Sequence, residues 1–465
     1  MKKIILFIYF LVLISPSLFG QNYERYKTLL DTSITSKNLG FNKKISITVP
    51  FEWQKELNRD FPLIIIFDRQ NQRSHQYIIN TIDYLTSTEQ MPSSIIVSVE
   101  SEQQYRYKET LYKESSKDGL GLANEKFLFE ELIPLMENHY KASKFRLFIG
   151  HSRYGYFTTS LLNARINELN AVIALSPFFT QTNIDLTDSL AKLNNQKLQS
   201  HKYYYYAIGN DYPADFAKMD AVTKKLNNTL FHTKGFHFKE ADHNATPGLA
   251  ISISLYEIFE KYSNIQSKYF SNDQTELSII PSLEKEILSS YGSNLAFSLG
   301  ILNGKGWFFY NKNEFDKAIE AWEILVKSYP NFSEGYLYII DAQKQLKKDF
   351  SLTATRFKNS ISKSDIYSEK EKEELLKEVW QMTSVTDGRV ARVISILRDV
   401  LGDDVKSPRY IETIPKRGYR FIAKVVEQEQ LIAQASDGYE APQNAAERKI
   451  NRIWWAGLTL ATLLL

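Results

Sequence analysis

Apolar residues follow two alternating patterns along residues 43–210. Alternating or continuous apolar runs predict strands at 45–50, 63–67, 94–99, 145–149, 171–177 and 202–208. Apolar positions spaced three or four residues apart predict helices at 76–85, 126–140 and 156–164. Strands that alternate with helices are typical of an α/β fold, with a mostly parallel sheet and flanking helices.

Helix-forming residues dominate the chain beyond residue 265, and we expect a helical region at 280–365. Within it, residues 302–346 fit one tetratricopeptide-like helix pair. The small, aromatic and helix-breaking positions of that repeat fall at Gly306, Phe309, Ala318, Trp322 and Pro330. One repeat cannot bury its own apolar face, so this region should pack on the preceding domain or on neighbouring helices.

Both ends of the chain have the pattern of targeting or membrane segments. A basic start and an apolar run at 4–14 predict an export signal at 1–20, with an uncleaved anchor as the alternative. Near the other end, Arg452 and the pair Trp454 and Trp455 precede an apolar stretch, as at the start of a membrane span. We therefore expect a linker at 427–452 and, at 453–465, a truncated transmembrane segment or a short anchor that contacts the membrane.

Composition narrows the chemistry. The 465 residues are enough for two or three domains, and the net charge of +3 does not indicate a nucleic-acid binder over the whole chain. The absence of cysteine excludes disulfides, thiolate catalysis and cysteine metal sites. We expect no metal and no cofactor.

The clearest candidate for catalysis is Ser152, in the sequence Gly150-His151-Ser152-Arg153-Tyr154-Gly155. A strand is predicted before this segment and a helix after it, which is the setting of a nucleophile elbow. Tyr154 stands where a glycine is common, and we expect it to crowd the elbow.

A nucleophilic serine requires a base and an acid that orients the base. Asp211 follows the strand predicted at 202–208, and His243 lies in a loop before the next helix, last in chain order. Asp215 and Asp242 are alternative acids. Of the other histidines, His151 is interpreted as structural, and His232 and His237 as surface or core residues.

The same mechanism needs two N–H groups that face the developing oxyanion. The main-chain N–H of Arg153 is one candidate, and Arg69 or Gln70, in the loop after Asp68, supplies the other. Asp68 itself is interpreted as a cap at the end of its strand.

Several separate segments resemble the family of esterases that includes esterase D-like enzymes and ferric-siderophore esterases. They are residues 62–68, the loop around Arg106, 119–140, the elbow at 150–155, 174–177 and 241–243. The resemblance implies an α/β-hydrolase domain at 25–265 with a triad of Ser152, His243 and Asp211. It also implies hydrolysis of a small-molecule ester without a cofactor.

A basic segment at 371–426 has a different pattern. Val390, Ile394, Leu397 and Leu401 form the apolar stripe of a predicted helix, and a basic hairpin is predicted at 409–422. The segment resembles the carboxyl half of the OmpR/PhoB-type winged helix of membrane-bound regulators, most closely at 401–404 and 409–421. The resemblance implies duplex DNA binding through residues 387–421, with these contacts: Arg389, Arg392, Ser395, Arg398, Lys416, Arg417 and Tyr419.

The two resemblances leave several alternatives open. The amino half of the winged helix is missing, and the hairpin has a simpler interpretation as a solvated basic surface. An export signal would place the whole chain outside the cytoplasm or in the periplasm, whereas DNA binding requires the cytoplasmic face of the inner membrane. The alternatives are an exported esterase with an inert tail, a membrane-associated transcriptional regulator, an inactive binding protein, or a join of two genes near 365–380.

Overall fold

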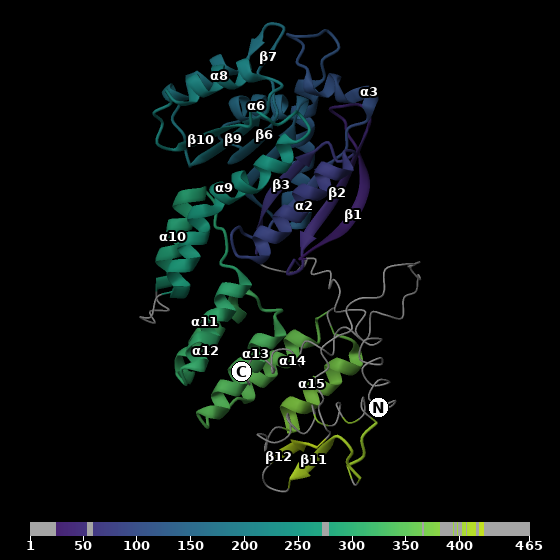
Figure 1. Cartoon of the computed structure of the whole chain (residues 1–465), viewed down its shortest axis with the longest axis vertical. Coiled ribbons are helices and arrows are strands. Elements are labelled where there is room, and N and C mark those ends of the chain that lie inside the picture. Colours follow the sequence, from purple (N-terminus) through teal and green to yellow (C-terminus); the bar gives the residue numbers. More distant parts are fainter. Residues whose placement is uncertain are drawn as a thin grey trace, which may run out of the picture. The chain divides into compact units, whose positions relative to one another are not determined.

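The structure is a computed structural model of the chain (Figure 1). It describes residues 25–53, 59–271, 279–364 and 367–381, and then 394, 398, 402–405, 407–414 and 418–422. The predicted signal, linker and apolar terminal segment lie outside the described residues. Within the described residues, no helix is both long and apolar enough to cross a membrane. The chain divides into two compact units, and residues 24–364 form the first.

An eight-stranded sheet forms the centre of the first unit, with the order β1-β2-β4-β3-β5-β6-β9-β10. All pairings from β4 to β10 are parallel, and β2 pairs antiparallel with both β1 and β4. The predicted sheet is therefore confirmed as mostly parallel, with an antiparallel edge. The strands are β1 (Tyr26–Thr35), β2 (Asn42–Pro50), β3 (Phe61–Phe67), β4 (Ile95–Val99), β5 (Ala142–His151), β6 (Ala171–Leu175), β9 (Lys202–Ile208) and β10 (Phe231–His237).

Burial explains which strands the sequence predicted. Every residue of β3, β4, β6 and β9 is buried, as expected for central strands covered on both faces. The edge strands β1 and β10 expose or half-expose most of their side chains, so they lack a continuous apolar run. Both edge strands extend a sheet whose predicted strands are all present.

Helices cover both sides of the sheet (Figure 1). Helices α2 and α9 pack against each other, and α6 packs on β5 and β6. The helices and short turns of this region are α2 (Gln72–Ser87), α3 (Gln103–Arg106), η2 (Lys108–Thr110), α4 (Gly121–Lys126), the π-helix η3 (Phe127–Leu132), α5 (Ile133–Tyr140), α6 (Arg153–Ala164), α7 (Leu186–Ala191), η4 (Lys192–Asn195), α8 (Pro213–Thr223) and α9 (Thr246–Ser271). A small hairpin, β7 (Thr180–Gln181) with β8 (Ile184–Asp185), precedes α7.

Further helices follow in the same unit: α10 (Ile280–Tyr291), α11 (Leu299–Asn311), α12 (Phe315–Ser328), α13 (Ser333–Gln345) and α14 (Ser351–Ile361). They pack on the sheet region, as expected. Asn170 Nδ2 donates to the carbonyl of Tyr291 at 3.0 Å, and the Arg59 guanidinium lies 4.4 Å from the Tyr329 ring centroid. A Cβ on Gly306 would overlap the Trp322 indole, so α11 and α12 pack closely there. Membership of the tetratricopeptide class stays a prediction.

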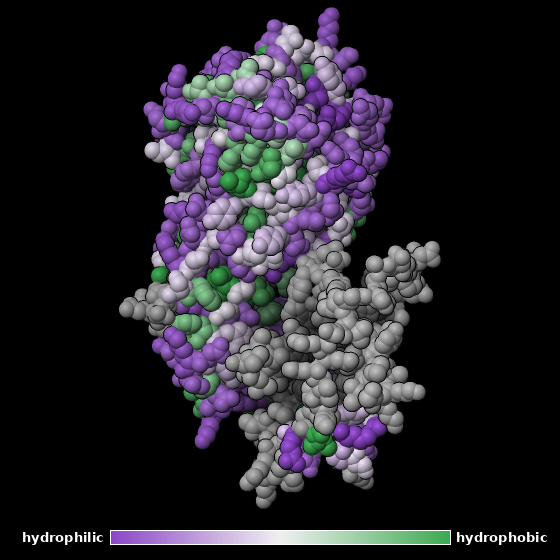
Figure 2. Space-filling model, in the orientation of Figure 1, coloured by the Kyte–Doolittle hydropathy of each residue, from purple (hydrophilic) through white to green (hydrophobic). Residues whose placement is uncertain are grey.

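The surface of the first unit is largely hydrophilic on the face shown in Figure 2, with small hydrophobic patches. Exposed hydrophobic residues of α9 include Leu249, Ile253 and Tyr256. The main apolar cluster is instead buried between the sheet and its helices.

The second unit contains α15 (Glu369–Gln381) and a two-stranded antiparallel sheet of β11 (Ile411–Ile414) and β12 (Gly418–Phe421). Ile411 pairs with Phe421, and Ile414 pairs with Gly418. The hairpin predicted from the sequence is therefore present.

Candidate active site

Ser152 occupies a sharp turn between β5 and α6. Its backbone has φ 58° and ψ −120°, a conformation that L-residues rarely adopt. The Ser152 N–H donates to the carbonyl of Leu175 at 2.8 Å, which ties the turn to β6. A Cβ on Gly150 would overlap the carbonyl oxygen of Tyr154, so the turn requires glycine there. This strand–turn–helix geometry is that of a nucleophile elbow.

Tyr154 does not crowd the elbow, contrary to our expectation. Its side chain is fully buried and stacks on Phe67, with ring centroids 4.6 Å apart. The Tyr154 hydroxyl donates to Glu109 Oε2 at 2.5 Å and shares a 2.6 Å hydrogen bond with Ser101. Glu109 also forms a buried ion pair with Lys43. The phenol therefore belongs to a polar cluster in the core and leaves the turn unobstructed.

The candidate base and acid are in contact. His243 Nδ1 and Asp211 Oδ2 are 2.6 Å apart, and both side chains are partly exposed. Ser176 Oγ lies 3.5 Å from Asp211 Oδ1 and donates to Thr246 at 3.1 Å. Within the described part of the chain, His243 Nε2 has no hydrogen-bond partner, Ser152 included. Nε2 is thus the ring atom left to exchange a proton with a substrate or nucleophile.

The two alternative acids have other partners. Asp215 Oδ1 accepts from the N–H of Phe179 at 2.8 Å. Asp242 Oδ1 accepts from the N–H groups of Asn244 and Ala245, in the turn before α9.

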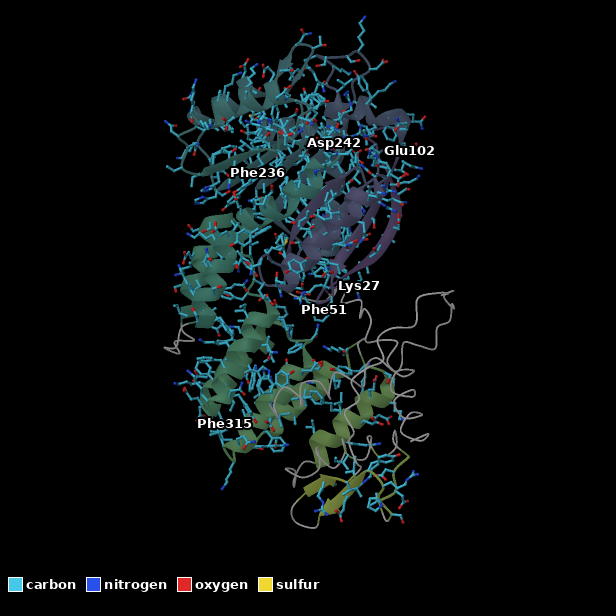
Figure 3. All side chains as sticks on the ribbon, in the orientation of Figure 1. Lys27, Phe51, Glu102, Phe236, Asp242 and Phe315 are labelled. Carbon is cyan, nitrogen blue, oxygen red and sulfur yellow. The ribbon has the colours of Figure 1, made fainter. Side chains whose placement is uncertain are left out.

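In Figure 3, Asp242 lies toward the same end of the sheet as Glu102, and Lys27 and Phe51 lie toward the other end. The loops that follow β4 and β10 therefore lie at the same end of the sheet.

His151 contacts the loop that carries the base, a contact that the sequence interpretation missed. His151 Nε2 donates to the main-chain carbonyl of His243 at 3.0 Å, and the two ring centroids are 4.6 Å apart. Burial lowers the pKa of His151, which favours its neutral form. The one feature of the sequence that could have indicated a role for His151 is its position directly before Ser152.

Of the two loop candidates for the oxyanion site, Gln70 is the one whose main-chain N–H has no partner among the described residues. The Arg69 N–H donates to the carbonyl of Val99 at 3.1 Å and so is occupied. Arg153 is the first residue of α6, where a main-chain N–H has no partner within the helix. The backbone of Asp68 adopts the left-handed conformation, with φ 61°. The Arg106 guanidinium donates two hydrogen bonds to the Asp68 carboxylate, from Nε at 2.8 Å and from Nη2 at 2.5 Å.

Among the described residues, no group of three or more His, Asp or Glu side chains is placed to hold a metal ion.

In the second unit, the structure corrects the role of Arg398. Its side chain is buried, Nη2 donates to the carbonyl of Ile411 at 2.9 Å, and the guanidinium lies 5.7 Å from the Tyr419 ring centroid. Arg398 is thus a core residue that holds the hairpin, and its charge does not face outward. The DNA-contact candidates Arg389, Arg392, Ser395, Lys416 and Arg417 lie outside the described residues.

Comparisons with known proteins agree with this architecture. Residues 36–233 match the family described as "Putative esterase", and residues 370–421 match "Transcriptional regulatory protein, C terminal". Both resemblances drawn from the sequence are thereby confirmed. The chain combines an esterase-like hydrolase domain with a C-terminal segment of the transcriptional-regulator class.

Individual curated relatives include transcriptional activators. The cholera toxin transcriptional activator of Vibrio cholerae is 38% identical over 88 residues, which cover 18% of this chain and 27% of that protein. The chain spans about a quarter of the length of the first curated relatives that it matches.

Two solved structures share the fold of the first unit. An uncharacterised protein from Capnocytophaga ochracea has a TM-score of 0.50 and 13% identity, covering 76% of this chain and 99% of that one. An IroE-like serine hydrolase from Shewanella oneidensis has a TM-score of 0.50 and 16% identity, covering 62% and 96%. At these identities the likeness shows the fold alone.

Proposed function

We propose that residues 25–265 form a serine esterase that cleaves a small-molecule ester through Ser152, His243 and Asp211. The observation that carries the proposal is the 2.6 Å contact between His243 Nδ1 and Asp211 Oδ2, together with the hydrogen bond that ties His243 to His151, the residue before the serine of the nucleophile elbow. The match of residues 36–233 to an esterase family supports the same class of reaction.

In the proposed mechanism, His243 carries each proton transfer of ester hydrolysis. With Nδ1–H donated to Asp211, His243 Nε2 accepts the proton of Ser152 as Oγ attacks the ester carbon. The carbon–oxygen bond to the alcohol then breaks, and His243 returns the proton to the leaving oxygen. Water attacks the acyl-enzyme, its proton passes to Nε2, and the carboxylic acid leaves as Ser152 regains its proton. The N–H groups of Arg153 and Gln70 stabilise the oxyanion.

Covalent labelling of the full chain with a fluorophosphonate probe tests this proposal. The probe should label the wild type and should not label Ser152→Ala. Ser362→Ala is the matched control, because Ser362 is exposed at the end of α14. A folded wild-type protein that takes up no label would contradict the proposal.

We propose a second function, duplex DNA binding, for residues 387–421. The match of residues 370–421 to a transcriptional-regulator family supports it, together with the β11–β12 hairpin. Fluorescence anisotropy with duplex DNA over a salt series should show affinity falling with salt, as counterion release requires. Arg417→Ala should weaken binding, and Arg356→Ala, which removes a charge from α14, should not. Absence of binding at low salt would contradict this function.

The two functions require different compartments, and we propose that the segment 1–20 directs the hydrolase out of the cytoplasm. The basic start and apolar run at 4–14 support this location. A reporter enzyme active only outside the cytoplasm, fused after residue 364, should be active. Loss of that activity in a chain without residues 2–20 would show that the segment acts as the signal. If the reporter fused after residue 364 is inactive although residues 1–20 are present, the cytoplasmic location is favoured.

A further inference from the structure

The side chain of Arg153, the residue directly after the candidate nucleophile, is a cation without a carboxylate partner among the described residues. Its guanidinium lies 3.8 Å from the Tyr107 ring centroid and 5.7 Å from that of Phe178. Its Nε is buried and has no hydrogen-bond partner. Arg106, by contrast, is satisfied by two hydrogen bonds to Asp68.

A row of aromatic rings extends from Arg153 to His243, the candidate base. Phe178 lies 6.1 Å from Tyr212, and Tyr212 lies 6.0 Å from the His243 ring, measured between centroids. Tyr107 is 59% exposed, so solvent reaches the outer face of this row. The guanidinium of Arg153 therefore lies at one end of a row of rings that ends at His243, and Arg153 itself directly follows Ser152 in the chain.

The positive charge of Arg153 has no carboxylate partner among the described residues. Burial, more than the neighbouring charge of Arg106, lowers the pKa of Arg153, whereas interaction with the Tyr107 phenol opposes this shift. A partly desolvated cation is stabilised when an anion supplies the missing hydrogen bonds. The planar guanidinium pairs with a carboxylate through two parallel hydrogen bonds, and stacking on Tyr107 restricts its orientation. The surroundings of Arg153 are thus suited to a carboxylate.

We propose that Arg153 makes this site select esters that carry a carboxylate close to the scissile bond. The inference rests on the proposed esterase function and names a feature of its substrate. Arg153 is then a specificity-determining residue, in addition to the part that its main-chain N–H plays at the oxyanion.

Matched pairs of esters test the selection in two arms. The acyl arm compares 4-nitrophenyl hemiglutarate with 4-nitrophenyl valerate, which has an acyl chain of the same length. The alcohol arm compares 4-carboxyphenyl butyrate with 4-carbamoylphenyl butyrate. We expect kcat/KM to favour the carboxylate by about tenfold or more in at least one arm, as for a hydrogen-bonded charge. The arm that responds shows which part of the ester faces Arg153.

Variants at position 153 assign the preference to this side chain. Arg153→Met should bring the carboxylate-to-neutral ratio of kcat/KM close to one, and Arg153→Lys should retain part of it. The ratio is the readout because a general loss of activity lowers both esters equally. Arg356→Met removes the same charge from α14 and should leave the ratio unchanged.

Two results would overturn the inference: equal rates for both esters in both arms, or a carboxylate preference that persists in Arg153→Met. If Ser152 takes no label and neither ester is cleaved, the esterase proposal fails separately. Calorimetric binding of 4-carboxyphenyl butyrate against its carbamoyl analogue then still decides the role of Arg153. Tighter binding of the carboxylate, lost in Arg153→Met, supports that role, and equal binding refutes it.

Discussion

His151 Nε2 donates a hydrogen bond to the main-chain carbonyl of His243 across 3.0 Å, joining the residue before the nucleophile to the base itself. Because a carbonyl only accepts, the proton is on Nε2 of His151. The elbow and the loop before α9 are therefore connected independently of any contact between Ser152 and His243.

This contact predicts a positioning role for His151. His151→Phe removes the donor and should lower kcat/KM on a neutral ester by about 10- to 100-fold, since a small displacement of the base suffices for such a loss. His151→Gln, which retains an N–H donor, should recover part of the activity. Steady-state kinetics, with circular dichroism as the control for folding, measure both. Equal activity of His151→Phe and the wild type would refute the role.

The partner of His243 distinguishes Asp211 from its two alternatives. Asp211→Asn should lower kcat by about 10³- to 10⁴-fold, because an amide no longer holds the imidazole in the tautomer that a base requires. Asp215→Asn and Asp242→Asn are matched controls, since these carboxylates accept main-chain N–H groups elsewhere. A larger loss in either control than in Asp211→Asn would assign the acid differently.

Tyr154 should matter for stability rather than for access to Ser152. Tyr154→Phe removes a donor from the buried Glu109 carboxylate, which should lower the free energy of unfolding by about 1–3 kcal/mol. Urea unfolding followed by circular dichroism measures this difference. Tyr84→Phe is the control, because Tyr84 is 67% exposed. An unchanged unfolding midpoint in Tyr154→Phe would show that the cluster does not require the hydroxyl.

Local patterns account for what the sequence predicted. The central strands are continuous apolar runs, and Asp211 and the elbow follow strands directly, so their positions depend only on neighbours in sequence. The contact between His151 and His243 spans 92 residues, and no local pattern encodes it. The edge strands β1 and β10 carry mixed polar and apolar residues, because solvent reaches one side of them.

Arg398 illustrates the limit for charged residues. On the predicted helix its charge indicated an outward-facing DNA contact, but its long side chain reaches the carbonyl of Ile411 and is buried there. Sequence position alone does not separate these two outcomes, because the methylene groups of arginine pack against apolar surface as readily as its head group binds phosphate.

Gly150 and Gly248 should respond in opposite ways to an added methyl group, because only Gly150 lies against another part of the backbone. Gly150→Ala should abolish labelling of Ser152 and reduce the yield of folded protein, because the added methyl group overlaps the Tyr154 carbonyl. Gly248→Ala, in the first turn of α9, meets nothing within 4 Å and should stabilise the protein by about 0.4–1 kcal/mol. Thermal unfolding and fluorophosphonate labelling test the pair. Full labelling of Gly150→Ala would contradict the elbow geometry.

We expect the histidine pair His201 and His232 to make the stability of the folded protein depend on pH. Their Nδ1 and Nε2 atoms are 2.6 Å apart, and burial, more than the charge of Lys261, lowers the pKa of both from 6.5. Below pH 6.5 the unfolded chain therefore binds protons that the folded pair does not, so the stability present above that pH is lost as the pH falls toward the folded values.

Urea unfolding at pH 7.5 and 5.5 should show this loss. Other histidines with a lowered pKa, His75 and His151, contribute in the same direction, so the pair is isolated by difference. The double variant His201→Gln/His232→Gln should lose less stability between the two pH values than the wild type does. Equal losses in both proteins would mean that the pair titrates alike in the folded and unfolded states.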